Sequence, residues 1–271
     1  RAVGMWQFML GTGRMFGLRV DRWVDERRDP VKATDAAARY LALLTKQFGS
    51  PYVAAAAYNG GPGRVSRGLR KLDGVEEDPE GNGLADAAFF QLSDTRHIRQ
   101  ETKDYVPKLI AAALIAKQPE RYGFPPIRPT PAYAADSVLV KDAVNLEVIA
   151  KLADTSVAAL RALNPQFLRG VTPPGRTSVV RLPVGRGEST AVRLASLPAS
   201  ERGTFQEHVV RRGESLGVIA GKYGVSVTEW EAAGPRVRPR ALQVGQVLVV
   251  PVVGGSRASR SEAAAPDRSS S

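Results

Sequence analysis

The hydrophobic positions of the first half of the chain recur at helical spacing. A first helix is predicted after Asp29-Pro30, a pair typical of a helix start, and it ends at Gly49. Its apolar positions repeat every three or four residues: Ala37, Tyr40, Leu41, Leu44 and Phe48. Further helices are predicted over 51–59 and over 99–117, where Pro107 is expected to bend or restart the helix. The first half is therefore predicted to be all helical.

Three stretches break this pattern. Residues 73–95 are acidic and rich in glycine, so we predict a loop with one aromatic anchor at Phe89-Phe90. The charged run 25–29, which contains Glu26, is expected to be a solvated turn. The proline-rich segment 121–131 is predicted to be a linker.

The second half contains an internal repeat. Residues 146–165 align with residues 216–235 at a constant offset of 70, and eight of the 20 positions are identical. Each copy follows a strand-like segment and precedes a β-rich run that ends in proline, at 179–183 and 247–251. Two small strand–helix–helix–strand modules are therefore predicted. The whole chain is assigned to the α+β class.

Composition narrows the chemistry. The chain has no cysteine, which rules out disulfides and cysteine nucleophiles, and its two histidines lie far apart in sequence. We expect no metal site and no cofactor. The formal net charge of +11 favours an anionic partner such as nucleic acid, acidic lipid or a wall polymer, but no nucleic-acid-binding motif accompanies it. No apolar run is long enough for a membrane span.

The second module resembles the LysM family. Its opening strand leads into Gly213-Glu214-Ser215-Leu216, and it closes with Leu242-Gln243-Val244-Gly245 before the last strand. The resemblance implies binding of N-acetylglucosamine-containing polymers in a shallow groove between two loops. The residues that it assigns to the groove are Gly213, Glu214, Ser215, Leu216, Arg236 and Val237.

The first module is LysM-like, with Ala143-Val144-Asn145 in place of the Gly-Glu-Ser turn and Pro173-Pro174-Gly175 in the closing loop. For either module the alternative is a structural βααβ spacer that packs on the first domain. The expected domains are a helical domain over 1–125, a LysM-like module over 133–185, a LysM domain over 205–253 and a disordered tail over 254–271.

Three motifs of the first half resemble the lytic transglycosylase domain of the soluble lytic transglycosylase, lysozyme-like superfamily. They are Ala2-Val3-Gly4-Met5-Trp6-Gln7-Phe8-Met9, Ala56-Ala57-Tyr58-Asn59-Gly60-Gly61-Pro62-Gly63, and Gln100-Glu101-Thr102-Lys103-Asp104-Tyr105. The resemblance implies that residues 1–125 are a transglycosylase (SLT) domain that lacks its N-terminal part, with a lysozyme-like fold and a sugar cleft. The residues that it assigns to the cleft are Gln7, Met9, Tyr58, Asn59, Glu101 and Tyr105, whereas Trp6 and Phe8 are expected in the core.

The same resemblance implies cleavage of the β-1,4 bond between N-acetylmuramic acid and N-acetylglucosamine, with formation of a 1,6-anhydro ring. One glutamate serves as the proton donor, and the motif places it in a Glu-Ser pair upstream of Arg1. No catalytic residue is therefore expected within the chain, which we predict to be inactive alone. Glu101 is the best acidic substitute.

Peptidoglycan glycan strands are the implied partner, and the bacterial cell envelope, periplasmic or associated with the outer membrane, is the implied location. A membrane contact is expected only through an N-terminal anchor preceding Arg1. The alternative is a wall-binding protein with a degenerate catalytic domain. Nucleic-acid binding rests on charge alone, and we expect none.

Overall fold

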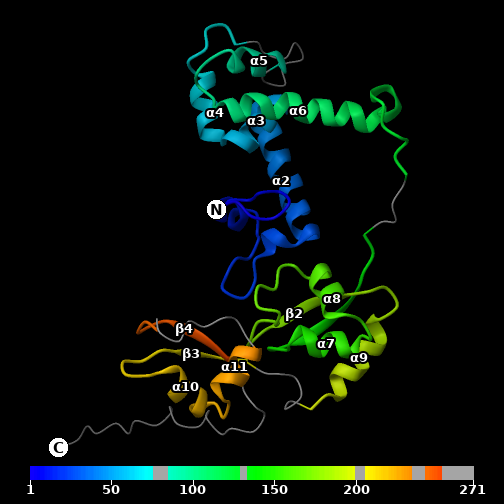
Figure 1. Cartoon of the computed structure of the whole chain (residues 1–271). Coiled ribbons are helices and arrows are strands. Elements are labelled where there is room, and N and C mark those ends of the chain that lie inside the picture. The colour runs from blue at the N-terminus through cyan, green and yellow to red at the C-terminus, as the bar shows by residue number, and fades with distance from the viewer. Residues whose placement is uncertain (76–84, 129–132, 199–204, 234–241, 252–271) are drawn as a thin grey trace, which may run out of the picture. The chain divides into compact units, whose positions relative to one another are not determined.

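The computed structural model describes residues 1–75, 85–128, 133–198, 205–233 and 242–251 (Figure 1). They form two compact units. The first unit contains residues 1–18 and 30–132, and the second contains residues 19–29 and 133–271. The first is helical and the second carries small antiparallel sheets, which confirms the α+β class.

The first unit is built from α-helices and one short 3-10 helix. Its elements are α1 (Leu10–Met15), α2 (Pro30–Phe48), α3 (Pro51–Gly60), α4 (Pro62–Leu69), α5 (Ala87–Ser93), α6 (Gln100–Lys117) and η2 (Pro119–Tyr122). The helix predicted after Asp29-Pro30 begins at Pro30. The next begins after Ser50, whose side chain caps it by accepting a hydrogen bond from the backbone N–H of Val53.

Helix α3 lies at the centre of this unit, because it contacts α2, α4, α5 and α6. Its buried positions are small: Val53, Ala54, Ala55, Ala56 and Ala57. Alanine side chains let neighbouring helices approach closely while they still exclude water. Phe89 and Val65 complete the apolar cluster around the helix. The helix therefore holds its last turn, with Tyr58 and Asn59, in a fixed place.

Three details of the first unit differ from the sequence-based expectation. Residues 87–93, expected within a loop, form the helix α5, because Phe89 and Leu92 are fully buried and stabilise it; residues 76–84 lie outside the described part. Phe89 is the predicted anchor, but Phe90 is 48% exposed. Helix α6 runs through Pro107 without a restart. The short helices α1 and α4 were not predicted.

The second unit contains the two predicted modules, each in strand–helix–helix–strand order. The first consists of β1 (Asp136–Lys141), α7 (Leu146–Leu152), α8 (Val157–Leu163) and β2 (Thr177–Leu182), and the second of β3 (Phe205–Val209), α10 (Leu216–Lys222), α11 (Val227–Ala233) and β4 (Val247–Pro251). The strands of each module pair in antiparallel fashion, with Val138 opposite Val180 and His208 opposite Leu248. The segment that joins the modules contains an unpredicted helix, α9 (Gly187–Ser196).

Residues 19–29 belong to the second unit, although unit-one residues flank them in sequence. The expected solvated turn at 25–29 is wrong. Asp25, Arg27 and Asp29 are buried, and Asp25 and Arg27 form a buried ion pair of 2.8 Å. Asp29 pairs with Arg181 at 2.8 Å. Each buried charge thus has a partner that offsets its loss of hydration, so this charged run can be buried.

Among the described residues, no helix has the length and apolar character that crossing a membrane would require. The expected disordered tail, 254–271, lies outside the described residues.

Candidate functional site

The opening stretch of the chain forms a tight turn. Val3 and Phe8 pair as an antiparallel bridge, and the backbone N–H of Gln7 donates to the carbonyl of Gly4 at 3.2 Å. Gly4 (φ 81°) and Gln7 (φ 50°) adopt left-handed backbone conformations. That conformation is costly for a residue with a side chain, so the Gln7 backbone is strained and must be held by its surroundings.

The turn separates buried from exposed side chains. Phe8 is buried and Trp6 is half-buried, as predicted for core residues, and the indole N–H of Trp6 donates to Thr34 Oγ1 at 2.8 Å. Gln7 is exposed, and its side-chain amide folds back to donate to the Gly4 carbonyl at 2.6 Å. Met9 is 56% exposed. Gln7 and Met9 are thus available to a ligand of the first unit.

Tyr58 connects this turn to helix α3. Its hydroxyl donates a hydrogen bond of 2.8 Å to the carbonyl of Trp6. Its ring packs against Tyr40, with centroids 5.3 Å apart, and edge-on against Phe8 at 6.4 Å. Burial, with smaller contributions from the Tyr105 and Tyr40 hydroxyls, raises the pKa of Tyr58 to about 12. The hydroxyl is therefore a neutral donor at physiological pH.

Asn59, the next residue, joins α3 to α6. Its side-chain oxygen accepts a hydrogen bond of 2.8 Å from the Thr102 hydroxyl, and its side-chain nitrogen donates to Glu101 Oε1 at 3.4 Å. The contact depends on Gly60, because an added Cβ there would lie 2.8 Å from Thr102 Oγ1. The glycine therefore permits the close approach of the two helices and is more than a helix stop.

Glu101 and Tyr105 lie one turn apart on α6. The Glu101 side chain is exposed, and Tyr105 is half-buried beside the apolar cluster around α3. Of the six predicted cleft residues, Asn59 and Glu101 are thus joined by a hydrogen bond, and Tyr58 and Tyr105 pack against the same apolar cluster. Gln7 and Met9 follow Trp6, whose carbonyl accepts the hydrogen bond from Tyr58.

In the second module, the predicted Gly-Glu-Ser-Leu turn is largely structural. Gly213 has a left-handed backbone (φ 87°), Ser215 caps α10, and Leu216 is buried. Glu214 Oε2 accepts from the Arg211 backbone N–H at 2.8 Å and contacts His208 Nε2 at 2.6 Å.

These two contacts, the backbone one first, favour the carboxylate and lower the pKa of Glu214. The other ring nitrogen of His208, Nδ1, lies 3.0 Å from the Tyr223 hydroxyl. Arg236 and Val237, the other predicted groove residues, lie outside the described residues.

Sequence reasoning missed the role of three participants of the first-unit site. Thr102 lies inside the third motif, but nothing in its spacing indicates that its hydroxyl reaches Asn59, 43 residues earlier. The Trp6 carbonyl is a backbone group, so no side-chain pattern could reveal it. Tyr40 was predicted only as an apolar helix position, yet it lies between Phe16 and Tyr58.

Comparisons with known proteins agree with the order of these elements. Residues 1–79 match the family described as "Transglycosylase SLT domain". Residues 134–199 match "Lytic transglycosylase MltD, LysM-like domain", and residues 208–251 match "LysM domain".

Relatives with curated names point the same way. The chain is 31% identical over 264 residues to the membrane-bound lytic murein transglycosylase D of Escherichia coli K12, covering 92% of this chain and 55% of that protein. It is 34% identical over 125 residues to the peptidoglycan transglycosylase gp16 of Escherichia phage T7, covering 45% of this chain and 8% of gp16. The chain thus spans about half the length of the transglycosylase D that it matches. The chain therefore carries an SLT domain followed by LysM-type domains, and it is similar to the lytic murein transglycosylase D of Escherichia coli.

Proposed function

We propose that the chain is part of a peptidoglycan lytic transglycosylase. The reaction cleaves the β-1,4 bond between N-acetylmuramic acid and N-acetylglucosamine and leaves a 1,6-anhydro-muramoyl end. The observation that carries the proposal is the hydrogen bond between Tyr58 and the Trp6 carbonyl, which fixes the exposed Gln7 and Met9 beside the end of α3. An amide and a thioether beside a neutral tyrosine suit an uncharged sugar face.

The proposed chemistry needs one proton donor. A carboxylic acid gives its proton to the leaving glycosidic oxygen while the substrate's acetamido oxygen attacks the anomeric carbon. The resulting carboxylate then accepts the proton of the sugar 6-hydroxyl as that oxygen attacks the anomeric carbon, displaces the acetamido oxygen and closes the anhydro ring. Because the acetamido oxygen is the nucleophile, the second carboxylate that most glycosidases require is unnecessary, and no water is consumed.

We propose that this donor is not one of the 271 residues. A general acid of this kind needs an apolar enclosure that keeps it protonated. Glu101 is exposed and lies beside the Asn59 amide. Glu26 lies in the second unit, where its carboxylate accepts from the Arg19 backbone N–H at 2.7 Å. Neither environment fits the role. Because the family motif places the donor upstream of Arg1, we propose that this chain alone gives no turnover.

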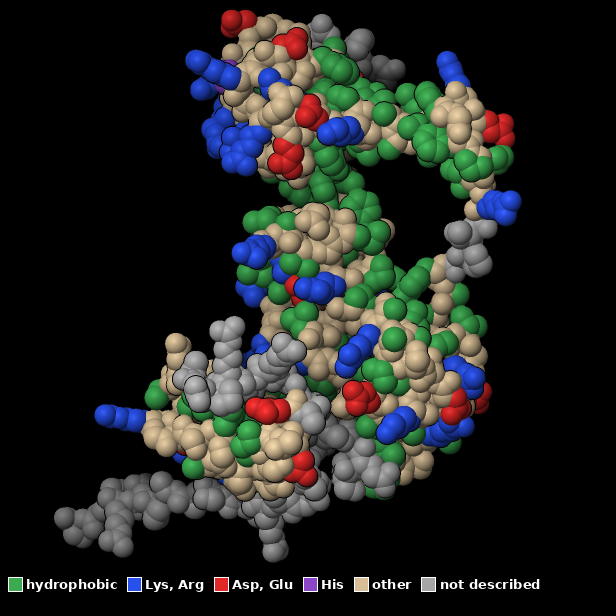
Figure 2. All heavy atoms as spheres, viewed as in Figure 1, with side chains coloured by type: hydrophobic (Ala, Val, Ile, Leu, Met, Phe, Trp, Pro, Cys, Tyr) green, Lys and Arg blue, Asp and Glu red, His purple; other side chains and the backbone are tan. Residues whose placement is uncertain are grey.

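The second LysM-type module is proposed to hold the enzyme on glycan strands in the bacterial cell envelope. Basic surface supports an anionic wall as the partner. Figure 2 shows Lys and Arg side chains gathered over α4, where Arg67, Arg70 and Lys71 are exposed. Peptidoglycan carries carboxylates on its stem peptides, which such a surface attracts over a distance of about 10 Å at ordinary salt.

Digestion of purified sacculi tests this function. The full-length gene product should release anhydro-muropeptides, and replacing its upstream glutamate with glutamine should abolish the release. The 271-residue chain should bind sacculi without releasing product. If the full-length product binds sacculi but releases nothing, a non-catalytic wall-binding protein is the correct alternative.

A further inference from the structure

Residues 19–29 fold as a hairpin within the second unit. Val20 and Asp25 pair as an antiparallel bridge, and the backbone N–H of Glu26 donates to the Arg19 carbonyl at 2.9 Å. The Arg19 backbone N–H returns a hydrogen bond of 2.7 Å to the Glu26 carboxylate. The hairpin is therefore closed at its base by its own polar groups.

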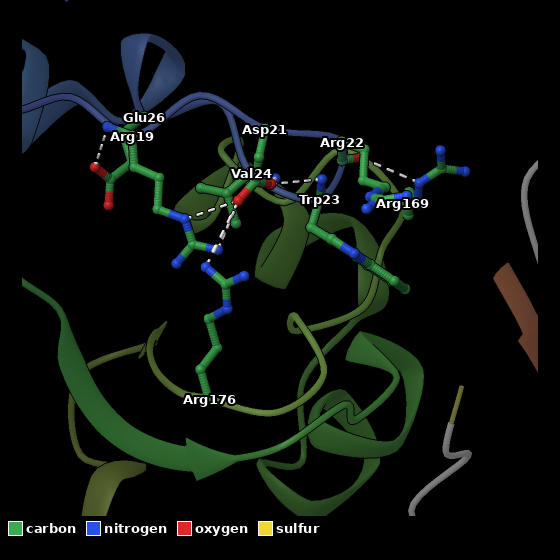
Figure 3. A network of polar contacts seen from close by, with 8 residues as sticks. All are labelled: Arg19, Asp21, Arg22, Trp23, Val24, Glu26, Arg169 and Arg176. Carbon is green, nitrogen blue, oxygen red and sulfur yellow. Dashed lines mark hydrogen bonds and ion pairs between the residues drawn. The ribbon is translucent and has the colours of Figure 1, made fainter. Parts of the chain in front are cut away.

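Asp21 fixes the tip of the hairpin. One of its carboxylate oxygens accepts from the backbone N–H groups of Trp23 at 2.7 Å and Val24 at 2.9 Å (Figure 3). An aspartate that binds backbone N–H groups two and three residues later orders a turn. The turn thereby presents Trp23 and Val24 in one orientation.

The backbone of the hairpin pairs with the loop 164–176, which precedes β2 in the first LysM-like module. Asp25 N–H donates to the Gln166 carbonyl at 3.0 Å, and Leu168 N–H donates to the Trp23 carbonyl at 2.9 Å. The residues between these contacts form an antiparallel bridge. Main-chain pairing of this kind is how one chain segment adds a strand to another.

Side chains anchor the pairing. Trp23 is 2% exposed and Val24 is 4% exposed, and both belong to the apolar core that Val140, Ile149 and other residues of the module form. The Arg169 guanidinium lies 5.8 Å from the centre of the Trp23 ring. The hairpin is thus part of the module's core rather than a cover on its surface.

A bidentate ion pair holds Asp29, the last residue of the segment 19–29, against the first module. The two carboxylate oxygens of Asp29 accept from the Arg181 guanidinium on β2 at 2.8 and 2.9 Å, and Asp29 is 1% exposed. Arg176 makes a looser contact of 3.6 Å with Asp21. The bidentate geometry and the burial of Asp29 make the Asp29–Arg181 pair favour one binding geometry over others.

The internal repeat identifies which loop positions of the first module pair with the hairpin. At the offset of 70, Gln166 and Phe167 correspond to Arg236 and Val237, the residues expected to hold glycan in the second module. In the first module these two positions pair with the hairpin instead. The same loop position therefore has a protein ligand in one module and is predicted to have a sugar ligand in the other.

We propose that the first LysM-like module is a receptor for the chain's own hairpin 19–29 and takes no glycan while the hairpin is bound. A sequence such as Asp-Arg-Trp-Val-Asp, with a buried tryptophan and flanking carboxylates, is the ligand. The contrast with the second module rests on the glycan binding proposed above. The receptor role rests on the described contacts alone.

A double-mutant cycle in the whole chain tests the receptor role. Asp29→Asn keeps a side chain that can cap α2, and Arg181→Gln removes the other partner. Each change should speed amide exchange of β1 and β2 by roughly tenfold or more, because the remaining charge is buried without its partner. The double change should cost less than the sum of the two. Amides of α10, whose buried residues belong to the separate core of the second module, should be unaffected.

Asp35→Asn, which breaks an exposed pair with Arg39 on α2, is the matched control and should change nothing in β1 or β2. Strictly additive effects, or no change in β1 and β2 exchange, would overturn the receptor role. Trp23→Phe offers a second route: protection of residues 136–182 should fall in that variant but not in Met15→Ala, whose side chain is 77% exposed.

Titration with chitopentaose tests whether the first module takes no glycan. The backbone amide resonances report which residues bind the sugar. Saturable shifts should appear in residues 205–251 and not in residues 164–176. Equal saturable shifts in 164–176 with the hairpin still protected would overturn the proposal. Shifts in neither module would refute the glycan binding proposed for the second module and leave the first module as proposed.

Discussion

The hydroxyl of Tyr58, on helix α3, donates a 2.8 Å hydrogen bond to the backbone carbonyl of Trp6, 52 residues earlier. This single contact ties the opening turn of the chain to the centre of the helical unit. Gln7, with its strained backbone, is the next residue after Trp6. The position of the exposed Gln7 and Met9 therefore depends on the hydrogen bond between Tyr58 and Trp6.

Tyr58→Phe should therefore loosen the opening turn. Loss of a hydrogen bond to a partly buried carbonyl should lower the unfolding free energy of the first unit by about 1 kcal/mol. Amide exchange of residues 3–9 should accelerate. Tyr52→Phe is the matched control, because it lies on the same helix and its hydroxyl has no hydrogen bond among the described residues. Equal effects of the two changes would contradict the role of the Trp6 contact.

Because α3 and α6 approach closely, the stability of the first unit should be sensitive to any added side-chain volume at Gly60. In Gly60→Ala the new Cβ would lie 2.8 Å from Thr102 Oγ1 and 3.0 Å from Cγ2, so the helices must separate. We expect a loss of about 1–3 kcal/mol in unfolding free energy, measured by urea denaturation. Gly11→Ala, at a helical position where nothing lies within 4 Å of the added carbon, should be neutral or stabilising. Comparable losses would show that the Thr102 contact is unimportant.

The activity of a Glu101 variant distinguishes a supporting role of this side chain from a role as proton donor. Because its side chain is exposed and hydrogen-bonded to Asn59, Glu101→Gln in the full-length product should lower turnover of sacculi by less than about tenfold. Removing a true general acid typically costs about 100-fold or more. A loss of that size, with unchanged folding by circular dichroism, would make Glu101 the donor and contradict the proposal.

The second LysM-type module should lose stability in acid. The Arg211 backbone N–H and His208 lower the pKa of Glu214 in the folded chain. The group therefore contributes stability above its unfolded pKa, and this contribution is lost as pH falls through the lowered folded pKa. In Glu214→Gln, amide protection of 205–251 should depend less on pH between neutrality and acid.

Glu231→Gln serves as the control, since that exposed carboxylate on α11 has no hydrogen bond among the described residues. If the wild-type module and the Glu214→Gln variant lose protection in parallel, the carboxylate does not stabilise this turn.

Sequence alone predicted the elements whose local signals agree with their packing. Ser50-Pro51 and the Gly-Gly-Pro-Gly run bracket α3, and the repeat of 70 revealed both βααβ modules. It failed at α5, where long-range burial of Phe89 stabilises a helix that its flanking glycines and acids conceal. It failed again at 25–29, because a charged run is buried only when distant partners such as Arg181 exist.

The candidate site shows the same division. The motif residues Tyr58, Asn59 and Glu101 were predicted as one group, and two of them are hydrogen-bonded to each other. Thr102 and the Trp6 carbonyl became visible only when α3, α6 and the opening turn were placed together. Such contacts depend on tertiary packing, which hydrophobic periodicity does not encode.

The chemical form of the released sugar end tests the central claim most directly. Mass spectrometry of the soluble products from sacculi treated with the full-length gene product should find N-acetylmuramic acid ends in the 1,6-anhydro form, lighter by one water than the hydrolysed form. Products that end in reducing N-acetylmuramic acid would mean that water is the nucleophile, and would contradict the proposal that this protein is part of a lytic transglycosylase.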